Sequence, residues 1–357
     1  MRRRVLVARL DSMGDVLLAG PAVRAVAASA EVVMLCGPRG ADAGRLLPGV
    51  AEVIEWDAPW IADPAPPATA ATASTLIRRV ERANIAEAVI LTSFHQSPLP
   101  LALCLRFAGV ARIGGASVDY AGSLLDVRLR PGEDLPEDIP EPERALRIAN
   151  AAGFTLPDGD DGRLAVRETR DMTAVTGTGA YVVLHPGAAV GARRWPVERF
   201  AETARLLAER GVRVVVTGTP GESALTAAVV DGVAGAIDLA IDLDLSSLAG
   251  LLARAAVVVV GNTGPGHLAA AVGTPVVSLF SPVVPAVRWA PYRVPVALLG
   301  DQSAPCRLSR ARECPVAGHP CLSTVTAEDA VDAIARLAPD LLAGRGAAAR
   351  ASEEVLT

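Results

Sequence analysis

The chain has 357 residues, of which 51% are apolar and only 3% aromatic, and its formal net charge is −5. Its length suits two domains of ordinary size, and its composition suits α/β layers of valine-rich strands and alanine-rich helices. A nucleic-acid-binding surface must be basic, so the negative net charge excludes a broad surface of that kind. The chain contains no lysine, so arginine is its fixed cation.

The first half of the chain alternates apolar runs with helical patterns. Strands are expected at residues 5–8, 32–36, 52–56 and 88–92. Helices are expected at residues 16–28, 75–83, 99–108 and 142–152. This alternation predicts βαβ units around a parallel sheet. The stretch 57–73, rich in proline and alanine, predicts a long surface loop.

Asp15 follows the first apolar run and a Ser-Met-Gly turn, and it opens the first helical pattern. A strand, turn and helix in this order place functional groups at the carboxyl edge of a parallel sheet. A carboxylate at that edge can serve as a general base. The alternative is that Asp15 caps its own helix, and this segment alone leaves both interpretations open.

The N-terminus carries three arginines, but Arg9 and Asp11 interrupt the apolar run that follows them. No stretch approaches the roughly 18 uninterrupted apolar residues of a membrane span. We therefore expect a cytoplasmic protein whose membrane contact is at most peripheral.

The second half starts a new α/β pattern. Strands are expected at residues 181–184, 212–217, 257–260 and 275–280. Helices are expected at residues 197–209, 246–255, from about 265, and at 327–337. Two successive α/β domains with a cleft between them follow from this repetition.

Three strand-to-helix turns of the second half carry groups suited to a nucleotide. The turn at residues 185–196 holds Arg193 and Arg194, which suit phosphate, although a solvated arginine pair is the alternative. The turn at 217–222 ends with Glu222, an acceptor for ribose hydroxyls or a base. A role at the start of the next helix is the more common reason for a glutamate at this position.

The turn at residues 260–271 leads from a strand into a helix. Backbone N–H groups from Thr263 to His267 would point out of the helix N-terminus and cradle a diphosphate. His267 supplies a further donor if its role is not purely structural.

The five cysteines are expected to be free thiols. Cys306, Cys314, His319 and Cys321 share one loop, but without a tight Cys-x-x-Cys pair they predict no metal site. The first turn lacks the G-x-G-x-x-G of a nicotinamide dehydrogenase, and a lysine-free chain cannot supply a Walker motif.

Together these motifs resemble glycosyltransferase family 9, the ADP-heptose lipopolysaccharide heptosyltransferases. The resemblance follows the chain order through residues 9–15, 185–188, 194–196, 262–268, 273–275, 280–282 and 321–322. It implies a GT-B fold, with two Rossmann-like doubly wound domains facing a central cleft. The implied parts are an acceptor-binding domain at 1–165, a nucleotide-sugar-binding domain at 175–326, and a helix at 327–342 that crosses back to the first domain. Residues 343–357 are expected to be a disordered tail.

The resemblance also implies an inverting, metal-independent transfer of a heptose from ADP-heptose to a glycan or other acceptor, with no cofactor. Asp15 matches the catalytic base. The implied donor contacts are Arg193, Arg194, Glu222, Asn262, Thr263, Gly264 and His267. Two of them depart from the family: Arg193 stands where relatives often hold lysine, and Asn262 replaces an aspartate that faces the donor sugar.

Acceptor contacts are expected at Ser12, Met13, Gly14, His95 and Gln96, since both segments follow strands of the first domain. The alternatives are a transferase of another nucleotide sugar in envelope or natural-product biosynthesis, and a GT-B nucleotide-sugar epimerase. A binding protein without catalysis is a third alternative, to which only Asn262 points.

Overall fold

The computed structural model describes residues 2–341 and divides the chain into two compact units, Met1–Arg167 and Glu168–Thr357. Each unit contains one parallel six-stranded sheet, as the α/β pattern predicts. The predicted tail at 343–357 lies outside the described residues.

The first unit is built on a sheet with the strand order β3-β2-β1-β4-β5-β6. Its strands are β1 (Arg4–Arg9), β2 (Glu31–Cys36), β3 (Val50–Glu55), β4 (Glu87–Ile90), β5 (Arg112–Ala116) and β6 (Val127–Leu129). The chain leaves β1 toward β2 and later returns to its other side as β4, so the switch point of the sheet lies between β1 and β4. Ala8 pairs with Ile90 across this point, and the residues that follow both strands therefore meet at one edge.

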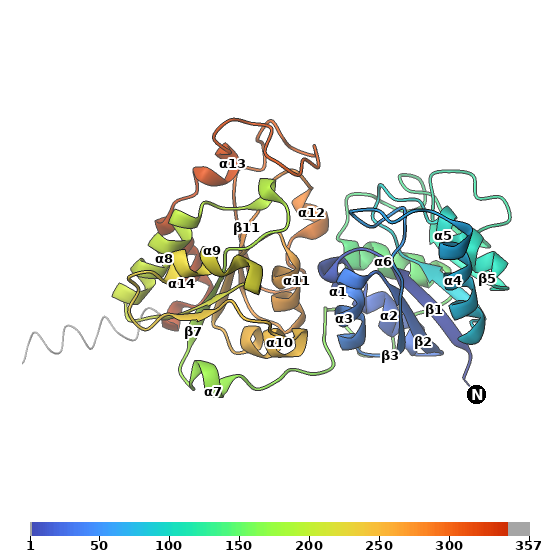
Figure 1. Cartoon of the computed structure of the whole chain (residues 1–357), viewed down its shortest axis with the longest axis horizontal. Helices are drawn as coiled ribbons and strands as arrows, with labels where there is room; N and C mark the ends of the chain where they lie inside the picture. The colour runs from blue at the N-terminus through green and yellow to red at the C-terminus, as the bar shows by residue number, and fades with distance from the viewer. Residues whose placement is uncertain (1, 342–357) are drawn as a thin grey trace, which may run out of the picture. The chain divides into compact units, whose positions relative to one another are not determined.

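Helices cover both faces of the first sheet (Figure 1). They are α1 (Met13–Leu18), α2 (Gly20–Ala27), α3 (Ala41–Leu46) and α6 (Glu141–Ala151) on one face, and α4 (Ala70–Arg82) and α5 (Leu99–Phe107) on the other. Leu6 and Ala8 of β1 belong to the core cluster beneath α4 and α5. The single helix predicted at 16–28 is two helices, because Pro21 fits only the first turn of a helix.

The second unit repeats this arrangement with the strand order β12-β11-β10-β7-β8-β9. Its strands are β7 (Tyr181–His185), β8 (Arg213–Thr217), β9 (Ile237–Leu239), β10 (Val257–Gly261), β11 (Val276–Leu279) and β12 (Val296–Leu299). The switch point lies between β7 and β10, where Val260 pairs with His185.

One face of the second sheet is covered by α8 (Val197–Glu209), α9 (Ser223–Val230) and α14 (Ala327–Leu337), while α10 (Leu245–Ala253) and α11 (Gly264–Ala271) form a separate pair (Figure 1). Val331 and Ile334 of α14 are buried in the core of the second unit. The apolar face of α14 packs against α8 within the second unit, and the expectation that a helix at 327–342 crosses back to the first domain stays a prediction. No described helix combines the length and apolar character needed to span a bilayer.

Candidate functional site

Asp15 lies in the first turn of α1, at the switch point of the first sheet. The helix starts at Met13 and its N-cap residue is Ser12, so Asp15 is not the N-cap residue but stands in the first turn of the helix. The Ser12 hydroxyl donates a hydrogen bond to Asp15 Oδ2 over 2.8 Å. Asp15 remains 21% exposed, while Gly14 beside it is buried. A carboxylate that is held by its neighbours and still reaches solvent suits a general base.

Arg9, the last residue of β1, joins several acidic groups at this edge. Its guanidinium contacts Asp15 Oδ1 at 3.0 Å, Asp11 Oδ2 at 2.9 Å and Glu141 Oε2 at 3.5 Å. It also donates a hydrogen bond to Ser93 Oγ, at 2.9 Å. Burial opposes the charge on Arg9, but its three acidic partners raise its pKa above the usual value, so it stays cationic.

The pKa of Asp11 is raised, first because its carboxyl is buried and then because Asp15 and Glu141 add negative charge, although Arg9 opposes the shift. Gln96 donates a hydrogen bond to Asp11 Oδ1, and its own Oε1 accepts one from the Ser93 backbone at 3.1 Å. The predicted acceptor residue Gln96 is therefore tied to the same network as Asp15.

A cavity of about 180 Å³ lies beside this network, at the carboxyl ends of β4 and β5. Its lining includes the predicted acceptor residues His95 and Gln96, together with Phe94, Ser117 and Arg144. The volume is below the roughly 300 Å³ of the smallest usual ligand pockets, so the cavity suits one ring or substituent rather than a whole acceptor.

In the second unit, β10 runs directly into α11 through Asn262 and the N-cap residue Thr263. In the first turn of α11, which starts at Gly264, Pro265 has no N–H group and the Gly266 N–H donates to the Thr263 carbonyl oxygen at 3.1 Å, so the helix start offers the backbone N–H of Gly264. His267 lies in this first turn and is only 5% exposed. A helix starts here, as the sequence predicts, and the binding of an anion at this start stays a prediction.

Arg193, which follows β7, reaches the same switch point. Its Nη1 donates to the Asn262 backbone oxygen at 3.4 Å. A Cβ on Gly261 would lie 2.9 Å from the Arg193 carbonyl oxygen, so glycine allows this close approach. Asn262 is itself buried, and its Nδ2 has no hydrogen-bond acceptor among residues 2–341. A ligand oxygen placed against Nδ2 would accept the hydrogen bond that this buried donor lacks and so favour binding.

The other predicted donor residues have local partners. Arg194 is exposed and donates from Nε to the Ala188 carbonyl oxygen at 2.8 Å, back into its own turn. Glu222 Oε2 accepts hydrogen bonds from the Thr219 backbone and hydroxyl, both at 2.9 Å, in a capping box. A role at the start of the next helix therefore accounts for one of the two Glu222 carboxylate oxygens. The other oxygen, Oε1, faces Gly187, where an added Cβ would lie 2.2 Å away.

His185 ends β7 at the switch point, and its Nδ1 lies 2.9 Å from Thr217 Oγ1. Burial lowers its pKa to about 4, although Glu222 opposes the shift. Between pH 4 and the usual 6.5 the unfolded chain then binds more protons at this residue than the folded one.

We therefore expect the stability contribution of His185 to be constant above pH 6.5 and to fall as the pH decreases toward 4. The loss is at most about 1.4 kcal/mol per pH unit. The difference in unfolding free energy between the wild type and His185→Gln, measured by chemical denaturation across this range, isolates the effect. A difference independent of pH would contradict the assignment.

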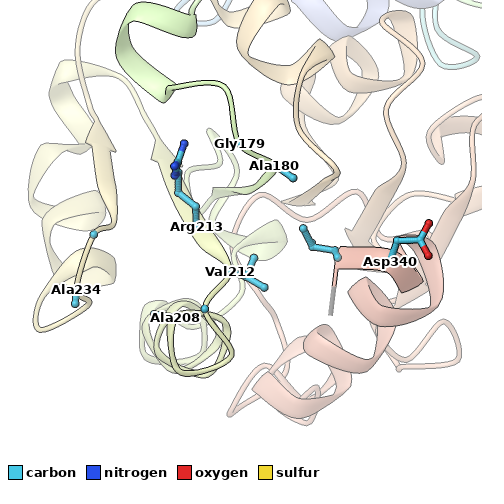
Figure 2. Close-up of a pocket in the computed structure, with 10 residues that line it drawn as sticks. Gly179, Ala180, Ala208, Val212, Arg213, Ala234 and Asp340 are labelled. Atoms are coloured by element: carbon cyan, nitrogen blue, oxygen red, sulfur yellow. The ribbon is translucent and has the colours of Figure 1, made fainter. Parts of the chain in front are cut away.

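A second cavity, of about 500 Å³, lies at the opposite edge of the second sheet (Figure 2). It is lined by Gly179 and Ala180, before β7, and by Val212 and Arg213, at the start of β8. None of the predicted site residues lines it, and it lies away from the carboxyl ends where the switch point is found.

Across residues 2–341 no group of three or more His, Cys, Asp or Glu side chains is arranged to hold a metal ion. The five cysteines are free, and burial raises the pKa of Cys321 to about 11.

The sequence interpretation omitted Arg9, Ser93 and Glu141 from the site. Arg9 carried a usable signal, because a charged residue at the end of a buried apolar run must find a partner. Ser93 and Glu141 carried none, since only the fold brings them to Arg9.

Comparisons with known proteins point to one family. Residues 142–318 match the model of "Glycosyltransferase family 9 (heptosyltransferase)". The chain is 28% identical over 328 residues to lipopolysaccharide heptosyltransferase 1 of Pseudomonas aeruginosa, covering 85% of this chain and 86% of that protein.

Solved structures share the fold. A family 9 glycosyltransferase of Veillonella parvula superimposes with a TM-score of 0.75 and 18% identity, covering 95% of this chain and 97% of the other. The ADP-heptose lipopolysaccharide heptosyltransferase II of Escherichia coli gives a TM-score of 0.71 and 20% identity, covering 94% of this chain and 99% of the other. The two Rossmann-like units of the predicted GT-B fold are thus confirmed.

Proposed function

The chain belongs to glycosyltransferase family 9, and from this premise we propose that it transfers a heptose from ADP-heptose to a hydroxyl group of a lipopolysaccharide core saccharide. The observation that carries the proposal is the helix start of α11, with Arg193 and Asn262 beside it at the switch point. Such a start favours the diphosphate of a nucleotide sugar. We place the reaction at the inner face of the cell membrane, where a lipid-linked acceptor would be met.

In the proposed reaction Asp15 takes the proton of the acceptor hydroxyl while its oxygen attacks the anomeric carbon of the donor. The bond from that carbon to the diphosphate breaks, and its electron pair leaves with ADP. Attack from the face opposite the leaving group inverts the configuration. Arg193, His267 and the backbone N–H of Gly264 would stabilise the charge that ADP gains, so that no metal ion is required.

Thermal unfolding with ADP, ADP-heptose, UDP, GDP and NAD tests the donor assignment. A ligand at about 100 times its Kd stabilises the folded state by roughly 2.7 kcal/mol. We expect ADP and ADP-heptose to raise Tm, with or without EDTA. Gly264→Val should remove this increase by blocking approach to the backbone, with little change in Tm without ligand. A response to NAD alone, or to none of these ligands, would contradict the proposal.

Asn262 favours one second candidate, a transferase that uses another sugar on the same nucleotide. The buried amide offers a donor, Nδ2, where a carboxylate would offer only acceptors. Under this alternative, ADP raises Tm and ADP-heptose raises it no further than ADP does. Asn262→Asp should then increase the response to ADP-heptose relative to ADP.

A further inference from the structure

Arg9 touches the proposed base but is too deeply buried to touch a substrate. It is 3% exposed, whereas Asp15 is 21% exposed. Its Nη2 bonds both Asp15 Oδ1, at 3.0 Å, and Ser93 Oγ, at 2.9 Å. A single nitrogen therefore links the base on α1 to the loop after β4.

The remaining guanidinium nitrogens of Arg9 anchor it from two other directions. Nε faces Asp11, in the turn before α1, and Nη1 faces Glu141, at the start of α6. The Asp11 and Glu141 contacts are ion pairs, at 2.9 Å and 3.5 Å, and together with the hydrogen bonds of Nη2 they restrict the orientation of the planar guanidinium. Asp15 Oδ1 is bonded to this fixed group, while Oδ2 is bonded to Ser12.

We propose that Arg9 is a positioning residue of the transfer reaction, one that orients the Asp15 carboxylate toward the acceptor and keeps it ionised. This inference rests on the proposed role of Asp15 as the base. Asp15 Oδ1 is bonded to Arg9 and Oδ2 to Ser12, and the side chain remains 21% exposed, so an acceptor hydroxyl can reach the carboxylate from solvent.

The charges around Arg9 explain why its cation matters. Asp11 and Asp15 from the β1–α1 segment and Glu141 from α6 are acidic, and Arg144 of α6 is a second cation. Without Arg9, Asp15 would face the two other carboxylates and lose its nearest positive partner. An opposite charge at this range typically lowers a carboxyl pKa by about 1–3 units, so its loss would move Asp15 toward the protonated form, which cannot accept a proton.

The test measures ADP release from ADP-heptose with a heptose-free lipopolysaccharide core as acceptor, across a range of pH. Arg9→Lys keeps the charge but cannot contact the partners on three sides at once. We expect kcat to fall about tenfold or more with KM for donor and acceptor unchanged. In Arg9→Met the acid limb of the kcat profile should move up by about 1–3 pH units.

Arg4→Met is the matched control, because Arg4 lies on the same strand and pairs with Glu31 and Glu52 near its other end. Its kcat and pH profile should match the wild type. If Arg9→Met fails to fold, Ser93→Ala replaces it, since that change removes only the 2.9 Å bond to Nη2. We expect Ser93→Ala to lower kcat several-fold without a change in KM.

The outcomes separate this inference from the proposed function. If Asp15→Asn keeps full turnover, Asp15 is not the base, and the positioning role of Arg9 is refuted with it. If Asp15→Asn is inactive, Asp15 stands as the base. If Arg9→Lys and Ser93→Ala then keep the wild-type kcat and pH profile, only the positioning role of Arg9 is overturned. A fall in kcat without any shift of the acid limb in Arg9→Met would overturn the claim that Arg9 keeps Asp15 ionised.

Discussion

Asp15→Asn is expected to lower kcat for heptose transfer by about 10²–10⁴-fold, the usual contribution of a positioned general base. The amide has the shape of the carboxylate but cannot take the acceptor proton. Arg9 keeps Asp11 and Glu141 as acidic partners, so the first unit should fold. The measurement is kcat from ADP release, with Tm and the ADP-induced increase in Tm recorded on the same samples.

Asp160→Asn is the matched control, because Asp160 is an acid of the same unit that pairs with Arg24 rather than with Arg9. Its kcat should equal that of the wild type. A variant Asp15→Asn that retains wild-type kcat would eliminate Asp15 as the base. Loss of the ADP-induced increase in Tm would instead point to a role in donor binding.

Trp195→Ala is expected to lower the unfolding free energy of the second unit by about 3–5 kcal/mol, as for other large aromatic residues in cores. The Trp195 side chain is 3% exposed and packs edge-on against Phe200, with ring centroids 4.8 Å apart. Its Nε1 donates to the Val325 carbonyl oxygen at 3.1 Å, so it joins the turn that carries Arg193 to the segment before α14.

Trp195→Phe is the control, since it keeps a ring in the core and loses mainly the hydrogen bond, at a cost of about 1–3 kcal/mol. Hydrogen exchange locates the effect: amides of β7 and β8 should exchange faster in Trp195→Ala, and those of β1 and β2 should not change. Equal acceleration in both units would contradict the separate core that we assign to the second unit.

Strands in the middle of each sheet were predictable because parallel strands buried on both faces require unbroken apolar runs. The runs at 32–36 and 257–260 correspond closely to β2 and β10. Toward the sheet edges this signal is weak. β5 contains Gly114 and Gly115, β6 and β9 have three residues each, and β12 is only partly buried, so these four strands were missed.

Helix ends depended on local chemistry that the periodic pattern does not include. α4 starts at Ala70, five residues before the predicted start, because the Thr69 hydroxyl accepts a hydrogen bond from the Thr72 backbone N–H. α9 was missed, although Glu222 and Thr219 form a capping box just before it. In contrast, α8 has the predicted bounds of 197–209, since Pro196 precedes a clear apolar face.

The sequence by itself determined the two α/β units, the place of Asp15 after β1 and the helix start after β10, because each depends on a short run of neighbouring residues. The tertiary structure alone decided what holds Asp15 in place. Ser93 lies 84 residues from Arg9 along the chain, and Glu141 opens a helix far beyond both. They meet Arg9 because β4 pairs with β1 and α6 packs against α2 on one face of the same sheet, long-range contacts that no local pattern encodes.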